Sequence, residues 1–199
     1  MNIIFATNNQ DKYNEIKEIM QEFPVGILSM REAGIDMDIE ENGLTFMENA
    51  IIKARAVYEA ASEGMLVIAD DSGLEVDYLN KEPGIYSARY LGVDTSYRIK
   101  NQSLIDRLSG VPDENRTARF VCAIAAILPN GDLLTSEETM EGRIDYQESG
   151  ENGFGYDPIF YLPEYKMTSA SLSKEDKNAI SHRGKALKVM KEKLSDYIS

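Results

Sequence analysis

The chain has 199 residues, of which 43% are hydrophobic and 28% are charged, a balance typical of a globular protein with a sizeable core. A formal net charge of −13 at pH 7 repels the phosphate backbone and argues against a nucleic-acid partner. A single cysteine excludes a disulfide within the chain, and no apolar run predicts a signal peptide or a membrane span. We therefore expect a cytoplasmic protein with no membrane partner.

The first elements are predicted to be a strand, a polar loop and a helix. Residues 2–7 are largely apolar, and Tyr13, Ile16 and Met20 then recur at helical spacing. Free backbone N–H groups at the start of such a helix can bind an anion, and Lys12 would add a positive charge for a phosphate. The alternative is an ordinary connection with a solvated lysine, because the loop lacks the glycines of a P-loop.

A second strand, an acidic run and a second helix are predicted next. Residues 25–30 predict the strand, and residues 36–42 carry a run of acids of the kind that usually forms a solvated surface. Thr45 and Glu48 have the spacing of a capping box, which begins a helix. Lys53 lies off the apolar stripe of this helix, so it either projects into a cleft or is solvated.

Residues 65–92 form the stretch around which we expect the chain to be organised. The apolar run 66–69 predicts a buried strand that ends at two adjacent carboxylates, Asp70 and Asp71. Neighbouring carboxylates repel each other and are costly to bury without a cation. They predict either a turn, in which Asp, Ser and Gly are common, or a site for Mg²⁺, which binds one or two carboxylates together with waters and phosphates.

The second half of the chain departs from a strictly alternating α/β pattern. Residues 95–109 predict an amphipathic helix, and residues 118–128 and 133–144 predict a hairpin of two strands. Residues 153–158 place glycines around aromatic side chains, which suits close approach to a flat ligand. The only histidine, His182, precedes a predicted terminal helix, and a lone histidine is more often structural than catalytic.

Six short motifs occur in order along nearly the whole chain. They lie at residues 7–12, 45–54, 69–74, 83–90, 154–158 and 181–183. Together they resemble the inosine triphosphate pyrophosphatase family, with Asn8 where many members have glycine. The resemblance implies an α/β fold, with a mixed twisted sheet and flanking helices in a single domain over residues 1–199. It also implies two lobes around a central nucleotide cleft.

The resemblance further implies an activity and partners. Purine nucleoside triphosphates of the non-standard kind (ITP, dITP and XTP) would be hydrolysed to the monophosphate and pyrophosphate, with Mg²⁺ as cofactor. The protein would thereby remove them from the nucleotide pool, and it would form a homodimer. Two alternatives stay open: a Maf-type pyrophosphatase acting on other nucleotides, and a sensor that binds a nucleotide without turnover.

The resemblance also implies roles for individual residues. Asp71 would activate the attacking water and hold the metal with Glu41, and Asp70 would lie nearby as a further metal residue. Glu40 precedes Glu41 in the same acidic run and is an alternative ligand. The substrate-binding residues would be Thr7, Asn8, Asn9, Gln10, Asp11, Lys12 and Lys53 at the triphosphate, Ser72, and Phe154, Gly155, Tyr156, Asp157, Lys177, His182 and Arg183 around the base and sugar.

Overall fold

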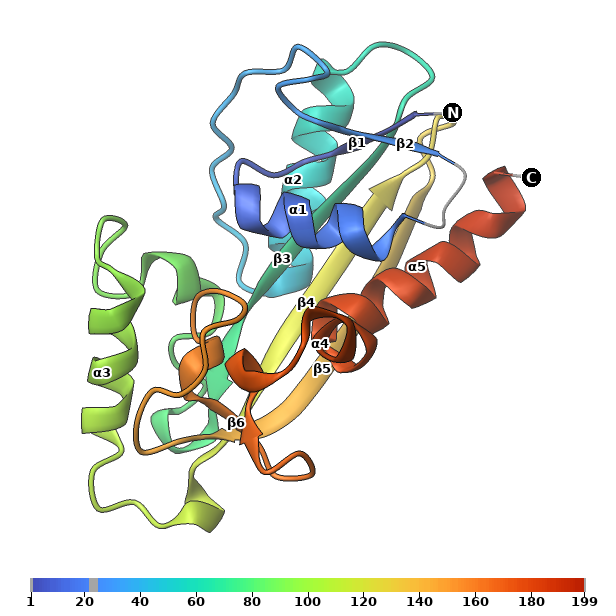
Figure 1. The fold of residues 1–199 in the computed structure, drawn as a ribbon. Coiled ribbons are helices and arrows are strands. Elements are labelled where there is room, and N and C mark those ends of the chain that lie inside the picture. The colour runs from blue at the N-terminus through green and yellow to red at the C-terminus, as the bar shows by residue number, and fades with distance from the viewer. Residues whose placement is uncertain (1, 22–24, 199) are drawn as a thin grey trace. The chain divides into compact units, whose positions relative to one another are not determined.

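The computed structural model describes residues 2–21 and 25–198 (Figure 1). Its strands are β1 (Asn2–Phe5), β2 (Gly26–Ser29), β3 (Leu66–Val76), β4 (Thr117–Ile127), β5 (Leu133–Ile144), β6 (Phe160–Leu162) and β7 (Met167–Thr168). Its helices are α1 (Gln10–Ile19), α2 (Phe46–Ala60), α3 (Tyr97–Arg107), α4 (Lys174–Ile180) and α5 (His182–Ile198). Short 3₁₀ turns connect several of these elements.

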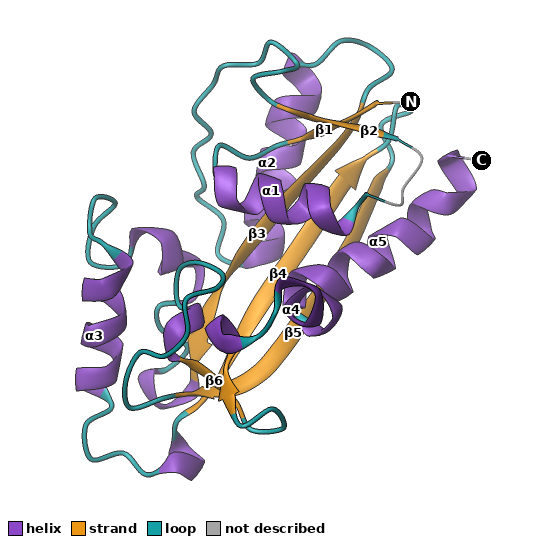
Figure 2. Cartoon of the chain, in the orientation of Figure 1, coloured by secondary structure: helices purple, strands orange, loops and turns teal. Residues whose placement is uncertain are grey.

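Within the described residues, the strands form one seven-stranded sheet in the order β2-β1-β3-β4-β5-β6-β7. β1 pairs in parallel with β2 and β3, whereas β6 is antiparallel to both β5 and β7. The sheet is therefore mixed and helices flank it, which confirms the predicted fold class (Figure 2). None of the described helices combines the length and the apolar character needed to cross a bilayer.

The chain divides into two compact units. Unit 1 comprises Met1–Asp71, Cys122–Glu138 and Arg183–Ser199, and unit 2 comprises Ser72–Val121 and Thr139–His182. Strands β3, β4 and β5 each contribute residues to both units. The single domain with a nucleotide cleft between two lobes stays a prediction.

The core of unit 1 is built on β1, β3 and β4 together with α1 and α5. Alternate residues of each strand point into it, such as Ile3 and Phe5 in β1 and Leu66 and Ile68 in β3. Cys122 is buried among them as a small hydrophobic residue, in agreement with its apolar sequence context. In Figure 1, α1 and α5 lie on one side of these strands and α2 lies on the other.

The core of unit 2 is built on the ends of β3, β4 and β5 that belong to it, with α3 packed alongside. Leu104 of α3 and Leu108, the C-cap of this helix, are fully buried there, as the helical spacing predicts, and Ile105 is partly buried. Phe120 and Phe160 contact each other at 4.5 Å between ring centroids. This core positions α3 next to residues 153–158, which follow β5 and which we call the glycine-rich loop.

Three elements differ from the sequence predictions. β3 does not end before Asp70 but continues to Val76, because the two carboxylates have cationic partners and can stay in a buried strand. The turn interpretation of Asp70 and Asp71 is therefore wrong. α4 was not predicted, since its residues are mostly polar; Ser173 caps it by accepting a hydrogen bond from the backbone N–H of Asp176 at 3.1 Å. α5 begins at His182 rather than after it.

Candidate functional site

Two clusters of charged residues in unit 1 are built on one strand. Asp70 and Asp71 are consecutive in β3, so their side chains point to opposite faces of the sheet. We call the group around the first side chain the Asp70 cluster and the group around the second side chain the Asp71 cluster. The Asp70 cluster comprises Lys12, Glu15, Asp70 and Arg183; the Asp71 cluster comprises Glu41, Asn49, Lys53 and Asp71.

The Asp70 cluster is largely buried, with 15% of the Lys12 side chain exposed. Oδ2 of Asp70 lies 3.2 Å from Nζ of Lys12 and 3.3 Å from Nη2 of Arg183, and the Asp70 side chain is 0% exposed. Nη1 of Arg183 also donates to Oε2 of Glu15, which α1 carries three residues after Lys12. Burial alone raises the pKa of the Asp70 carboxyl, but Lys12 and Arg183 outweigh it and hold that pKa well below its ordinary value. Asp70 is therefore an ionised, structural partner of two cations.

The start of α1 lies next to this cluster. Asn9 is its N-cap and accepts a hydrogen bond from the backbone N–H of Lys12 at 3.0 Å, while Thr7 Oγ1 accepts one from the N–H of Asn9 at 3.1 Å. The Asn8–Asp11 stretch is exposed. The structure thus presents residues 7–12 at a helix N-terminus, with Lys12 beside it, which is the geometry expected of a phosphate site.

The Asp71 cluster is more open. Lys53 Nζ lies 2.9 Å from Oδ1 of Asp71 and 3.3 Å from Oε1 of Glu41, whose side chain is 30% exposed. Asn49, one helical turn before Lys53, donates to Asp71 Oδ2 at 3.3 Å and accepts from the N–H of Gly43 at 2.8 Å. Asn49 thereby ties the loop that carries Glu41 to the strand that carries Asp71.

The electrostatics of Asp71 differ from those of Asp70. Burial raises the pKa of the Asp71 carboxyl above its ordinary value, and the attraction of Lys53 offsets this only in part. Burial lowers the pKa of Lys53, but the neighbouring carboxylates outweigh it, so the net shift is upward. A carboxylate with a raised pKa, next to a lysine that stays charged, suits a group that takes up a proton.

The residues expected to hold Mg²⁺ are only partly brought together. Among the described residues, no group of three or more His, Cys, Asp or Glu side chains could hold a metal ion. Asp70 faces Lys12 and Arg183 instead. Asp71 and Glu41, however, converge on Lys53 Nζ, and two carboxylates around one cation fit the donor set that Mg²⁺ uses with waters and phosphates. The contact with Lys53 favours Glu41 over Glu40 as the second acid.

A third group lies in unit 2, in and around the glycine-rich loop. Oδ2 of Asp157 accepts hydrogen bonds from Lys177 Nζ at 2.7 Å and from the N–H of Phe154 at 2.8 Å. Oδ1 of Asp157 accepts one from Ser169 Oγ at 2.8 Å, and Lys177 Nζ lies 5.4 Å from the centroid of the Phe154 ring. A Cβ at Gly153 would lie 2.2 Å from Asp157 Oδ2, so only glycine fits there. The loop is held closely around Asp157.

The remaining candidates have mixed surroundings. His182 is buried and stacks on Phe120 at 4.9 Å between ring centroids, with 12° between the planes. Tyr156 is also buried, and its hydroxyl donates to the carbonyl oxygen of Ser87 at 2.8 Å. Arg183 belongs to the Asp70 cluster, and Ser72 is partly exposed in β3. The roles of these side chains toward a base or sugar stay predictions.

Sequence reasoning missed several residues that complete these groups. Glu15, Asn49 and Ser169 each hold a candidate side chain in place. Asn49 and Lys53 are four residues apart on α2, and that spacing signals a shared helical face. Ser169 carried no comparable signal, because its partner Asp157 lies twelve positions away across a loop and two short strands.

Comparisons with known proteins agree over the whole chain. A model of the Ham1 family matches residues 3–193. A Clostridium perfringens protein named dITP/XTP pyrophosphatase is 49% identical over 195 residues, which cover 96% of each protein. The structure of the Staphylococcus aureus Ham1 protein shares 43% identity and a TM-score of 0.87, covering 99% of this chain and 100% of that one. A HAM1 protein from Coxiella burnetii, 39% identical, also has a TM-score of 0.87, covering 98% of this chain and 99% of that one.

Proposed function

Since the chain belongs to the Ham1 family, we propose that it is a pyrophosphatase of non-standard purine nucleoside triphosphates, which it hydrolyses to the monophosphate and pyrophosphate. The substrates are dITP and XTP, by similarity to relatives of that name, and ITP, which has the same base as dITP. The observation that carries this proposal is the Asp71 cluster, in which the buried Asp71 and the partly exposed Glu41 share the ammonium group of Lys53.

Hydrolysis at the α-phosphorus needs a positioned water, a group to accept its proton and positive charge around the phosphates. Asp71 accepts the proton, because its carboxylate lies beside the charged Lys53 and is oriented by the amide of Asn49. Lys53 and Lys12 bind phosphate oxygens, and the N-terminal N–H groups of α1 add hydrogen bonds to them. Glu41 and Asp71 would hold Mg²⁺, which when bound neutralises charge on the triphosphate and on the departing pyrophosphate.

Selection of the base falls to the group around Asp157. Phe154 is partly exposed and offers an aromatic face for a purine, while Lys177 and Asp157 fix the loop that carries it. Purines with oxygen at the 6-position differ from adenine by an acceptor in place of a donor. A hydrogen-bond donor there, for which we propose His182, would leave the adenine amino group unpaired and reject it strongly.

A pyrophosphate-release assay across ITP, XTP, dITP, ATP and GTP tests the proposal. We expect turnover of the first three with Mg²⁺, with IMP and pyrophosphate as the products from ITP, and loss of turnover in EDTA. Formation of IDP and orthophosphate would contradict the reaction. Preference for other nucleotides would favour the Maf-type alternative, and binding without product would favour a sensor.

The proposal includes a homodimer in the cytoplasm. Both follow from the family resemblance and not from a described surface. Light scattering on the purified chain, with and without nucleotide, would measure the mass in solution. A mass corresponding to one chain at micromolar concentration would contradict the dimer.

A further inference from the structure

The buried face of α3 carries two polar residues that the proposed mechanism does not use. Lys100 and Asn101 are each 1% exposed, beside the fully buried Leu104. Burial of a lysine and an amide costs free energy unless their polar groups find partners. The partners of these two side chains therefore indicate what the helix is holding.

Both side chains hold backbone carbonyl groups of other segments. Asn101 Nδ2 donates to Oε1 of Glu148 at 2.8 Å and to the carbonyl oxygen of Gly155 at 3.3 Å. Lys100 Nζ donates to the carbonyl oxygen of Ala88 at 2.6 Å. α3 is thus fastened to the glycine-rich loop through a buried amide.

Tyr97, one helical turn before Asn101, reinforces this attachment. Its ring meets the ring of Tyr156 edge to face, with 5.2 Å between centroids and 90° between planes. Gly155 has a φ of +69°, a conformation that favours glycine, and a Cβ there would lie 3.5 Å from the Tyr97 ring. The backbone of Gly155 is therefore held against α3 in one conformation.

The glycine-rich loop is consequently held at two points. Asp157, with Lys177 and Ser169, fixes its second half, and Asn101 fixes the carbonyl of Gly155. Phe154 lies next to both points and is itself only half-buried. The carbonyl that Asn101 holds belongs to the peptide between Gly155 and Tyr156, one residue after Phe154, so Asn101 constrains the backbone that carries the Phe154 ring.

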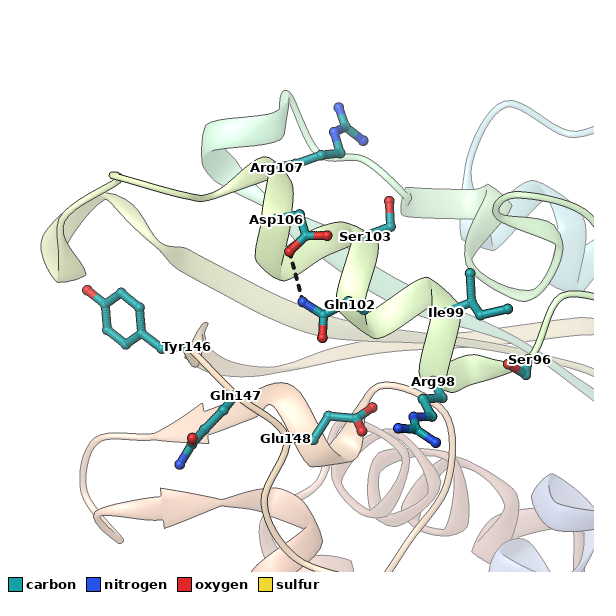
Figure 3. A pocket seen from close by; sticks show the side chains of 10 residues that line it. All are labelled: Ser96, Arg98, Ile99, Gln102, Ser103, Asp106, Arg107, Tyr146, Gln147 and Glu148. Carbon is teal, nitrogen blue, oxygen red and sulfur yellow. Dashed lines mark hydrogen bonds between the residues drawn. The ribbon is translucent and has the colours of Figure 1, made fainter.

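We propose that Asn101 is a positioning residue for nucleotide-base binding: its amide fixes the Gly155 carbonyl so that Phe154 meets the purine in one orientation. Glu148 lines a pocket beside α3 (Figure 3). Its carboxylate accepts a hydrogen bond from the Asn101 amide and orients that amide. This inference rests on the proposed function, since it takes the loop to bind the base. It makes Asn101 matter to the affinity for nucleotides and not to the chemical step.

A swap of two side chains separates positioning from stability. Asn101→Asp removes the donor and sets a carboxylate against Glu148, so this single variant is expected to melt at a lower temperature. Asn101→Asp with Glu148→Gln restores one hydrogen bond, because the new glutamine amide donates to the new carboxylate. The bond to the Gly155 carbonyl stays lost. The matched control is Gln102→Ala, an exposed neighbour on α3 whose amide donates to Asp106 within the helix (Figure 3).

Steady-state kinetics with ITP and dITP, and competition by inorganic triphosphate, provide the readout. In the double variant we expect KM to rise about five- to tenfold, the worth of one hydrogen bond, with kcat within about twofold. The inhibition constant of inorganic triphosphate, which has no base, should not change. The inference would be overturned if the double variant kept the wild-type KM, or if only its kcat fell. It would also be overturned if the inhibition constant of inorganic triphosphate rose as much as KM. An inactive wild-type protein would instead overturn the proposed function and, with it, the premise of the inference.

Discussion

Asp70 and Asp71 are the same residue type at consecutive positions of β3, yet the structure gives them opposite properties. Asp70 is sealed against Lys12 and Arg183, and its pKa is held well below the ordinary value. Asp71 shares a single lysine with a partly exposed acid, and burial raises its pKa. The strand's alternation directs one carboxylate toward α1 and α5 and the other toward α2. Environment and not residue type therefore separates a structural acid from a candidate base.

The largest effect on stability should come from a substitution in the Asp70 cluster. Arg183→Ala removes one of two cations from a fully buried carboxylate, and loss of one partner of a buried ion pair costs about 3–5 kcal/mol of unfolding free energy. Chemical denaturation measures it. Arg183→Ala combined with Asp70→Asn should recover part of the loss, since the buried negative charge is removed as well.

Two measurements sharpen this result. Because the folded pKa of Asp70 is depressed, its contribution to stability is present above its ordinary pKa of 3.8 and is lost as the pH falls further. Asp70→Asn should therefore flatten the acid limb of the stability curve. Burial raises the pKa of the Cys122 thiol to about 12, so it should resist alkylation at pH 8 in the folded wild type. Faster alkylation in Arg183→Ala would report unfolding, because Arg183 itself lowers that pKa. If Arg183→Ala were as stable as the wild type, the structural role of the Asp70 cluster would be contradicted.

The second-largest effect should come from a substitution in the Asp71 cluster, and it should appear mainly as a loss of turnover. Asp71→Asn keeps the shape and still accepts from Lys53 but cannot take up a proton. We expect kcat to fall at least about 100-fold, the range for a general base. The unfolding free energy should change less than in Arg183→Ala, because the Lys53 ammonium group keeps Glu41 as a charged partner. Pyrophosphate release and thermal melting measure the two quantities; a folded variant with normal turnover would remove Asp71 from the mechanism.

The smallest effect on stability should come from Glu41→Gln. The side chain is 30% exposed, and a pair of that kind contributes about 0.2–1 kcal/mol. If Glu41 helps to hold the metal, the same change should raise the Mg²⁺ concentration needed for half-maximal turnover. Glu40→Gln is the matched control in the same acidic run, and an equal Mg²⁺ requirement in both variants would argue against the choice of Glu41.

Much of the fold was predictable because it depends on local patterns. The apolar stripe and capping Thr45 predicted α2, and a long apolar run followed by a tight turn predicted β4 and β5. The end of β3 was not predictable in this way. Polar residues at 70–73 read as a turn in isolation, and only cations from α1, α2 and α5 allow them to remain in a strand.

The sequence motifs named several residues of the two clusters, but they did not indicate which of these residues pair with each other. The motifs identified Asp70, Asp71, Lys53 and Arg183 together, but nothing in their spacing shows which residue faces which. Arg183 and Asp70 are 113 positions apart, and the resemblance alone placed Arg183 at the base. Residues that act by holding others, such as Asn101, carry little sequence signal, since a polar residue on a helix usually indicates an exposed face.

Lys53 has a consequence for the protein in its resting state. Its ammonium group already lies between Asp71 and Glu41, the two carboxylates that we propose would hold Mg²⁺. The folded chain therefore carries its own counter-cation, unlike a zinc-finger domain, which unfolds when the metal leaves. Treatment with a chelator should leave the melting temperature unchanged. The protein can then be stored, purified and returned to activity without refolding, because the metal would be required only while a triphosphate is bound.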